Sequence, residues 1–414
     1  MRYKSSLVIP VALLLLPAAC GDKQTAPSPG PVQSLAVPAS AGSRSPNLAE
    51  GPDGTLLLSW MEPAGDGHAL FYSEFSGAAW SAPLEVARGA NWFVNWADFP
   101  SVVPVSAHLF AAHWLVSQPA GGYAYDVFVS LSGDRGATWS APQRPHRDGT
   151  PTEHGFVSIY PHADGAGMIW LDGRKTAEKP PHAGEIMGMT LRSAVIRPDL
   201  TIQDEQEVDG LICDCCQTDV GITAAGPVAV YRDRTAGEVR DIFVSRASGK
   251  DWDEGRPIAR DQWNIAACPV NGPTISASGQ DLAVAWFTAT GGKPVVRLAF
   301  SGDAGETFFA PIDIAVGNVF GRVGVATLSP GTAIVSWLGK TGERQAEISV
   351  ARVTADGIVG TPVILAKGQT ISGFSVPQIV LVNGQLLMAW TADTEGESRV
   401  QSALIPLSLF DPPI

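Results

Sequence analysis

Seven apolar segments, each ending in an aromatic residue, recur along this chain at intervals of about 50–60 residues, the length of a four-stranded propeller blade. They are Thr55–Trp60, His108–Trp114, Gly165–Trp170, Pro227–Tyr231, Asp281–Trp286, Thr332–Trp337 and Gln385–Trp390. Each is followed by a second apolar segment, and usually by a short third one, so each repeat has room for four short strands. The 44 glycines and 32 prolines favour tight turns over long helices.

We therefore predict an all-β fold: a β-propeller of seven blades, in which each blade is a four-stranded antiparallel sheet. Six blades are the alternative, if one repeat is irregular. The seventh repeat has no fourth strand, because the chain ends soon after Leu404. The segment 32–37 matches the missing strand, and an N-terminal strand that closes the ring would leave no open sheet edge.

Two hairpin tips share the pattern Ser-x-Asp-x-Gly-x-Thr followed by an aromatic residue. In such a tip, Asp accepts backbone N–H groups, Gly supplies the positive φ, and the aromatic ring returns to the sheet core. The motif residues are Ser132, Asp134, Gly136 and Trp139 in one copy, and Ser301, Asp303, Gly305 and Phe308 in the other. We assign them a structural role at the outer rim, away from the channel.

The N-terminus has the features of an export signal: a positive start, an apolar stretch, and small residues before Cys20. Its Ala-Ala-Cys sequence resembles the cleavage site of bacterial lipoproteins, so we expect residues 1–20 to form a lipoprotein signal peptide and Cys20 to carry the lipid. Gly21 then favours the outer membrane, and export without a lipid is the alternative. Residues 21–43, rich in Pro, Ser, Ala and Gly, are predicted to be a tether to a propeller of residues 44–414.

The net charge of −13 argues against a nucleic-acid partner, which normally requires a basic surface. An anionic small molecule would have to meet a local basic pocket. We expect a monomer that contacts the membrane only through its lipid anchor.

Charged residues gather where the chain enters the first strand of each blade and where it leaves the second. First strands line the channel of a propeller, so these residues are expected to meet at one end of it, here called the channel mouth. Candidates for ligand binding are Arg44, Asp172, Arg174, Arg232, Arg234 and Arg322, and candidates for acid–base catalysis are Asp98, Glu153 and His154. So many charged side chains in one place favour a binding or catalytic site.

Three segments resemble the sialidase family and its Asp-box relatives, and the likeness in architecture covers nearly the whole mature chain. The segment that starts at Arg44 resembles the family's opening arginine segment, 230–234 its central arginine strand, and 373–375 its late tyrosine segment. The resemblance implies a carbohydrate or other anionic ligand, with three arginines around its carboxylate. By position these are Arg44, Arg232 or Arg234, and Arg322.

The chain departs from the family at the two residues that carry the family's reaction. Phe374, which has no hydroxyl, stands at the position of the tyrosine nucleophile, and Gln217 stands nearest the glutamate that activates it. We therefore expect a sialidase-like protein that binds its ligand at the channel mouth without the standard reaction. A divergent glycoside hydrolase, similar to exo-α-sialidases, is one alternative, and a non-enzymatic scaffold for a periplasmic protein partner is another.

The remaining cysteines form an even set: Cys213, Cys215, Cys216 and Cys268. Outside the cytoplasm such a set predicts two disulfides, with Cys215–Cys216 and Cys213–Cys268 as one pairing and a Cys216–Cys268 bridge between blades as another. The same thiols are soft ligands for copper or zinc, so a metal-binding protein is an alternative, and a redox thiol pair is a third. No other cofactor is expected.

Overall fold

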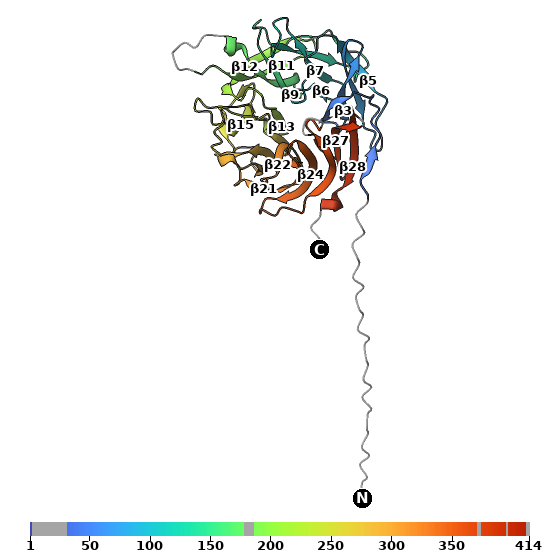
Figure 1. Ribbon diagram of the computed structural model, residues 1–414, viewed down its shortest axis with the longest axis vertical. Coiled ribbons are helices and arrows are strands. Elements are labelled where there is room, and N and C mark those ends of the chain that lie inside the picture. Colours follow the sequence, from blue (N-terminus) through green and yellow to red (C-terminus); the bar gives the residue numbers. More distant parts are fainter. Residues whose placement is uncertain (2–30, 178–185, 371–373, 395, 411–414) are drawn as a thin grey trace.

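Seven antiparallel sheets stand around a central axis in the computed structural model, which confirms the predicted all-β propeller with seven blades (Figure 1). The structure describes residues 1, 31–177, 186–370, 374–394 and 396–410. Residues 2–20 of the predicted signal peptide, including Cys20, and residues 21–30 of the predicted tether lie outside these residues. Within the described part of the chain, no helix is long and apolar enough to cross a membrane.

Six of the sheets take their strands in chain order from the channel outward, and the last sheet takes its outermost strand from the N-terminus. The first four sheets are β2 (Arg44–Glu50), β3 (Leu56–Ala64), β4 (Gly67–Glu74) and β5 (Leu84–Gly89); β6 (Ser101–Pro104), β7 (Phe110–Ser117) and β8 (Tyr125–Ser132); β9 (His154–His162), β10 (Gly165–Asp172), β11 (Met189–Ile196) and β12 (Ile202–Ile212); and β13 (Asp219–Thr223), β14 (Gly226–Arg232) and β15 (Ile242–Ser248) with the short β16 (Asp251–Trp252) and β17 (Arg256–Pro257).

The other three sheets complete the ring. They are β18 (Thr274–Ser278), β19 (Asp281–Thr288), β20 (Val295–Ser301) and β21 (Ile312–Val316); β22 (Val319–Ser329), β23 (Thr332–Lys340), β24 (Gln345–Thr354) and β25 (Val363–Thr370); and β26 (Gln378–Val382), β27 (Gln385–Thr394) and β28 (Glu397–Pro406) with β1 (Gln33–Leu35). Short 3-10 turns lie at Arg174–Ala177, Thr290–Gly292 and Leu407–Phe410.

The ring is closed by the N-terminal strand. β1 pairs antiparallel with β28, so that Gln33 faces Leu404 and Leu35 faces Ser402. The predicted closing segment 32–37 contains this strand. The inner strands contact one another in a closed circle in the order β2, β6, β9, β13, β18, β22, β26 and back to β2. One sheet is less regular: β6, β7 and β8 form three strands, and the fourth position is held by a single bridge between Val129 and Gln143.

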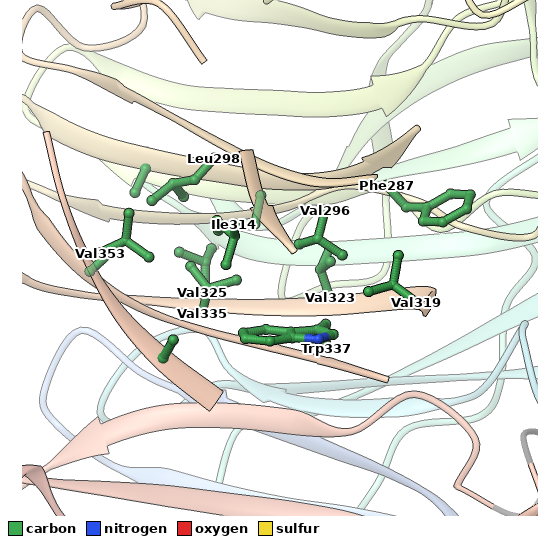
Figure 2. Packing of buried hydrophobic residues seen from close by; sticks show 14 of the residues in the cluster. Phe287, Val296, Leu298, Ile314, Val319, Val323, Val325, Val335, Trp337 and Val353 are labelled. Atoms are coloured by element: carbon green, nitrogen blue, oxygen red, sulfur yellow. The ribbon is translucent and has the colours of Figure 1, made fainter. Parts of the chain in front are cut away.

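Apolar side chains fill the space between neighbouring blades. The described residues form seven buried clusters, and each of them joins one pair of adjacent sheets. Figure 2 shows one cluster, in which Val296 and Leu298 of β20 pack together with Val325 and Trp337 of the next sheet. Because every sheet is covered on both faces, its strands are apolar nearly throughout, as in the segments that end in aromatic residues.

The two hairpin motifs adopt the same hydrogen-bonded turn. In the first, Thr138 N donates to Asp134 Oδ1 at 2.9 Å and Gly136 N donates to Ser132 Oγ at 2.6 Å. The corresponding distances in the second are 2.9 Å from Thr307 N to Asp303 Oδ1 and 3.0 Å from Gly305 N to Ser301 Oγ. Hydrogen bonds from Thr138 and Ser132 lower the pKa of Asp134 to about 2. Trp139 and Phe308 pack against the apolar clusters between blades.

The glycines of the two motifs allow a matched test of the turn. Both have positive φ, +84° at Gly136 and +78° at Gly305, but a Cβ would lie 1.8 Å from Tyr72 Oη at Gly136 and no closer than 3.4 Å to any atom at Gly305. We expect Gly305→Ala to lower the free energy of unfolding by about 1–2 kcal/mol, the cost of a left-handed residue. Gly136→Ala should cost about 1–3 kcal/mol more, because Tyr72 has to move.

Urea unfolding of the two variants beside the parent protein measures this difference. Equal losses would mean that Tyr72 moves away from the turn without cost.

Candidate functional site

The channel mouth is spanned by the segment 90–100, which connects β5 to β6. Its backbone is held by side chains from other blades: Gln217 Nε2 donates to Ala97 O at 2.7 Å, and Ser375 Oγ donates to Trp96 O at 2.9 Å. Gln217 Oε1 accepts a hydrogen bond from Gly272 N at 3.0 Å. Gln217 therefore uses both ends of its amide to tie the mouth together.

Arg322 lies beneath this segment. Its guanidinium carbon is 3.7 Å from the ring centre of Trp96, and its Nη1 donates to Ser375 O at 2.7 Å. The side chain is buried, and burial lowers the pKa of Arg322 to about 9. Arg322 thus supports the segment over the mouth through a cation–π contact and a backbone hydrogen bond.

Below the mouth, the channel holds a cavity of about 510 Å³. It is lined by residues of the inner strands, and Asp98, Gln217 and Asp219 are among its polar members. Burial raises the pKa of Asp219 to about 6, although its carboxylate accepts hydrogen bonds from Ile275 N and Val220 N.

Two of the predicted catalytic residues meet at the mouth through a tyrosine. Tyr125 Oη is 2.6 Å from Asp98 Oδ2 and 2.9 Å from Glu153 Oε1. Asp98 and Tyr125 are buried, Phe156 N donates to Asp98 Oδ1 at 2.8 Å, and Phe93 stacks on the tyrosine ring at 4.0 Å. Glu153 remains partly exposed.

Tyr125, Asp98 and Glu153 form one chain of hydrogen bonds, so the protonation state of each affects the other two. A tyrosine hydroxyl has one proton to donate, so it fully satisfies both carboxyl groups only if one of them is protonated and donates to Oη. Burial raises the pKa of Glu153 to about 8 and that of Asp98 to about 7, so this pair of carboxyl groups holds a proton at neutral pH. The geometry is therefore a short proton relay from Glu153 through Tyr125 to Asp98.

His154, the third predicted catalytic residue, points away from this relay. Successive residues of a strand face opposite sides, and the ring of His154 stacks on His146 with 3.8 Å between centres. His154 Nε2 lies 3.3 Å from Asp148 Oδ2 and 3.8 Å from Asp172 Oδ1. Burial opposes a charge on His154, but the carboxylates of Asp148, Asp172 and Asp126 raise its pKa overall.

Two predicted ligand-binding residues belong to this buried network. Arg174 Nε donates to Asp172 Oδ1 and Arg174 Nη2 donates to Asp172 Oδ2, both at 2.7 Å, and Nη2 also reaches Glu205 at 2.9 Å. Trp170 Nε1 donates to Asp172 Oδ2 at 2.9 Å. Asp172 and Arg174 thus pair with each other inside the blade. Their side chains lie beside the channel mouth and do not point into it.

The other three candidate arginines differ in their burial and in their contacts. Arg232 is buried and donates to Asn271 O, Arg240 O and Phe287 O, at 2.7 to 3.0 Å. Arg234 is paired with Asp214 at 2.9 Å and with Glu238 at 2.6 Å. Arg44 is half-buried, with a long hydrogen bond of 3.4 Å from Nε to Gly42 O. Arg44 is the candidate best able to meet a ligand.

Phe374, which stands at the family's tyrosine position, is fully buried. It belongs to the apolar cluster between the sixth and seventh sheets, together with Leu338, Ile348 and Trp390. An apolar core residue therefore stands at the position where the sialidase resemblance implies a tyrosine nucleophile.

The four cysteines come together at the rim of the mouth as free thiols, so neither predicted disulfide pairing is formed in the structure. Cys213 Sγ and Cys216 Sγ are 3.3 Å apart, and Cys215 Sγ lies within 4.8 Å of both. Cys268 is near enough to Cys215 to affect its pKa. Hydrogen bonds from Cys215 and Cys216, with the charges of Arg232 and Arg240, lower the pKa of Cys213.

Sequence reasoning missed Tyr125, although the topology contained a signal for it. Strands alternate in direction within a blade, so the first residue of the third strand lies at the same end as the first residue of the first strand. Tyr125 begins β8 and forms a bridge with Glu153 just before β9. A search at the starts of third strands as well as first strands would have included it.

No family model matches the chain, and no curated protein sequence does. A protein of unknown function from Dyadobacter fermentans is similar in structure, with a TM-score of 0.51, 12% identity, and coverage of 92% of this chain and 100% of the other. An α-L-arabinofuranosidase of Fusarium graminearum has a TM-score of 0.48 at 13% identity, over 92% and 99% of the chains. A sialidase of Streptococcus pneumoniae has a TM-score of 0.46 at 10% identity, over 92% and 95%. The likeness to the Dyadobacter protein supports the fold alone, and none of these comparisons carries anything about activity.

Proposed function

We propose that the channel mouth is an acid–base site and that the protein is a divergent glycoside hydrolase. The observation that carries this proposal is the pair of carboxyl groups held on one tyrosine hydroxyl, at 2.6 Å and 2.9 Å. Two carboxyl groups that flank a scissile bond, one of them protonated, are the usual machinery of glycoside hydrolysis.

Glu153 is the general acid of this proposal, because it is partly exposed and its pKa is raised to about 8. It gives its proton to the leaving oxygen of the substrate. As the bond between the anomeric carbon and this oxygen breaks, a water molecule adds its hydroxyl to the anomeric carbon, and the proton that the water releases restores Glu153. The hydroxyl of Tyr125 holds the Glu153 carboxyl group in place at 2.9 Å.

The substrate class rests on Arg44 and on the resemblance of the sequence around it to the opening arginine segment of the sialidases. This arginine stands at the start of β2, is half-buried, and has no ion pair among the described residues. A guanidinium in this position suits a carboxylate or another anionic group on a sugar. We therefore expect an anionic glycoside rather than a neutral one.

A second candidate is carbohydrate binding without hydrolysis. Asp98 and Tyr125 are both buried and Glu153 is partly exposed, so a ligand at the mouth would touch Glu153 before it reached them. In that case Glu153 would hydrogen-bond the ligand and no bond would be cleaved.

Glu153→Gln is expected to lower kcat/KM about 10²–10⁴-fold on anionic aryl glycosides with a poor leaving group, such as methoxyphenyl α-sialosides. The loss should be much smaller for a dinitrophenyl leaving group, which departs without a proton. The parent kcat/KM should fall as pH rises through about 8, because Glu153 must be protonated to act, and the variant should lose this dependence.

Glu254→Gln, at an exposed position of the fourth blade, is the matched control and should behave like the parent. A parent protein that binds the sugars but cleaves none of them would favour the second candidate. An equal loss for both leaving groups would remove Glu153 from the role of general acid.

A further inference from the structure

The four cysteines of the rim form a cluster that the proposed acid–base reaction does not use. Three of them, Cys213, Cys215 and Cys216, have sulfur atoms within 4.8 Å of one another, and Cys215 also reaches Cys268 from the loop before β18. The described residues contain no other group of three thiols close together. Sulfur atoms from two distant segments therefore converge on one point.

The loop that carries three of these thiols is fixed before any ligand arrives. Cys213 N donates to Arg232 O at 3.0 Å, and Asp214 accepts a hydrogen bond from Met189 N at 3.2 Å and pairs with Arg234 at 2.9 Å. The side chain of Gln217 ties the end of the loop to the segment across the mouth. A preformed loop lowers the entropic cost of gathering several ligands around one ion.

A buried positive charge is directed at the cluster. Arg240 is almost fully buried, and its Nη1 donates to Cys213 Sγ at 3.2 Å, while its Nη2 pairs with Glu238 at 2.8 Å. Arg232, also buried, adds a second positive charge nearby. A donor of this kind favours thiolate sulfur, the form that binds metals, and orients it as an outer-shell partner.

The cluster is open to solvent on one side. Cys213 and Cys216 are buried, Cys215 is half-buried and Cys268 is exposed. This increase in exposure from Cys216 to Cys268 gives an ion a path from solvent to the cluster. The two buried sulfur atoms can then bind the ion away from water.

We propose that Cys213, Cys215, Cys216 and Cys268 form a binding site for a soft metal ion, and specifically for Cu(I). Thiolates alone, with no imidazole or carboxylate in the sulfur cluster, are the ligands that select Cu(I) among physiological ions, with Zn(II) as its main competitor. Cys213 and Cys216 have the Cys-x-x-Cys spacing that is common in zinc sites, so Zn(II) is the ion that the test has to compare with Cu(I). Binding replaces thiol protons by the ion, so each ion bound releases protons to solvent.

The test uses the full chain with Cys20→Ser, which removes the one thiol outside the cluster and serves as the parent. Reduced, oxygen-free protein is titrated with Cu(I) held by a chromogenic Cu(I) chelator, and separately with Zn(II). We expect one Cu(I) per chain, near-ultraviolet thiolate-to-copper absorption, and a higher melting temperature in the loaded protein. Cys268→Ser, at an exposed position that does not endanger folding, should weaken Cu(I) binding by at least about 100-fold.

Two outcomes would overturn the proposal. Parent protein exported by its host and denatured without reductant could show no thiol that reacts with an alkylating reagent, which would make the cluster two disulfides. Alternatively, Cys268→Ser could bind Cu(I) as tightly as the parent, which would remove Cys268 from the site and overturn the assignment of four cysteine ligands. Tighter retention of Zn(II) than of Cu(I) against matched chelators would keep the metal site and overturn its assignment to copper.

Discussion

Replacing Arg232 with methionine is expected to lower the free energy of unfolding by about 3–5 kcal/mol. Arg232 donates hydrogen bonds to three buried or partly buried carbonyl oxygens, those of Asn271, Arg240 and Phe287, and two of these residues belong to the next blade. A buried acceptor that loses its partner costs roughly 1–3 kcal/mol. Methionine fills most of the volume but supplies no donor, so the loss should appear in urea unfolding of the purified protein.

Two further variants test whether Arg232 stabilises the fold through these hydrogen bonds. Arg232→Lys keeps the charge but lacks the planar fork, so it should recover only part of the lost stability. Arg88→Met, at an exposed ion pair with Glu85, should change stability by no more than about 0.5 kcal/mol. If Arg232→Met unfolded like the parent but failed to bind an anionic ligand, the arginine would have the role that the sialidase resemblance implies.

This arginine shows where sequence reasoning stops. Its position at the end of a second strand predicted that it would lie near the channel mouth, and the strand bounds support that placement. The sequence contained no information on whether the guanidinium would face a ligand or the carbonyl groups of the neighbouring blade. That choice depends on the side-chain direction and on the backbone of residues 271 and 287, which only the packed ring brings together.

The repeat architecture could be predicted because its signal is local. An apolar strand that ends in tryptophan or tyrosine is visible in a window of six residues, and all seven expected segments overlap second strands of the blades. The closing strand was predicted for a different reason, because the seventh repeat had a missing partner. Register and pairing at that strand follow from the ring closure itself.

Several residues of the candidate site were predicted, but the sequence did not indicate which of them lie together. Asp98 and Glu153 were expected at the mouth, and the structure joins them through Tyr125. His154, the neighbour of Glu153 in sequence, lies in a separate network with His146 and Asp148, because adjacent strand residues face opposite ways. Asp98 was expected at the mouth, but the segment 90–100 has no apolar period to indicate its path, so its contacts with Gln217 and Ser375 of other blades were not predicted.

Loss of the closing strand is expected to be the most damaging change to the ring. Leu35 of β1 is 7% exposed and packs in the cluster that includes Trp60 and Leu404, so it belongs to the interface between the last and first blades. Leu35→Asp would place a charge in that cluster and should lower the free energy of unfolding by about 3–5 kcal/mol. Val32→Asp, beside the strand at 45% exposure, is the matched control and should change stability by no more than about 0.5 kcal/mol.

A chain that begins at residue 39 extends the same test, because it removes the pairing between β1 and β28 altogether. The freed edge of β28 would present unpaired backbone groups, so we expect this chain to associate through that edge, as light scattering would detect. Hydrogen exchange should rise in β26–β28 and in β2–β3, which meet at the closure, and change little in β18–β21 on the other side of the ring. If protection fell equally in all blades, the propeller would unfold as one cooperative unit and the closing strand would stabilise the whole of it rather than one interface.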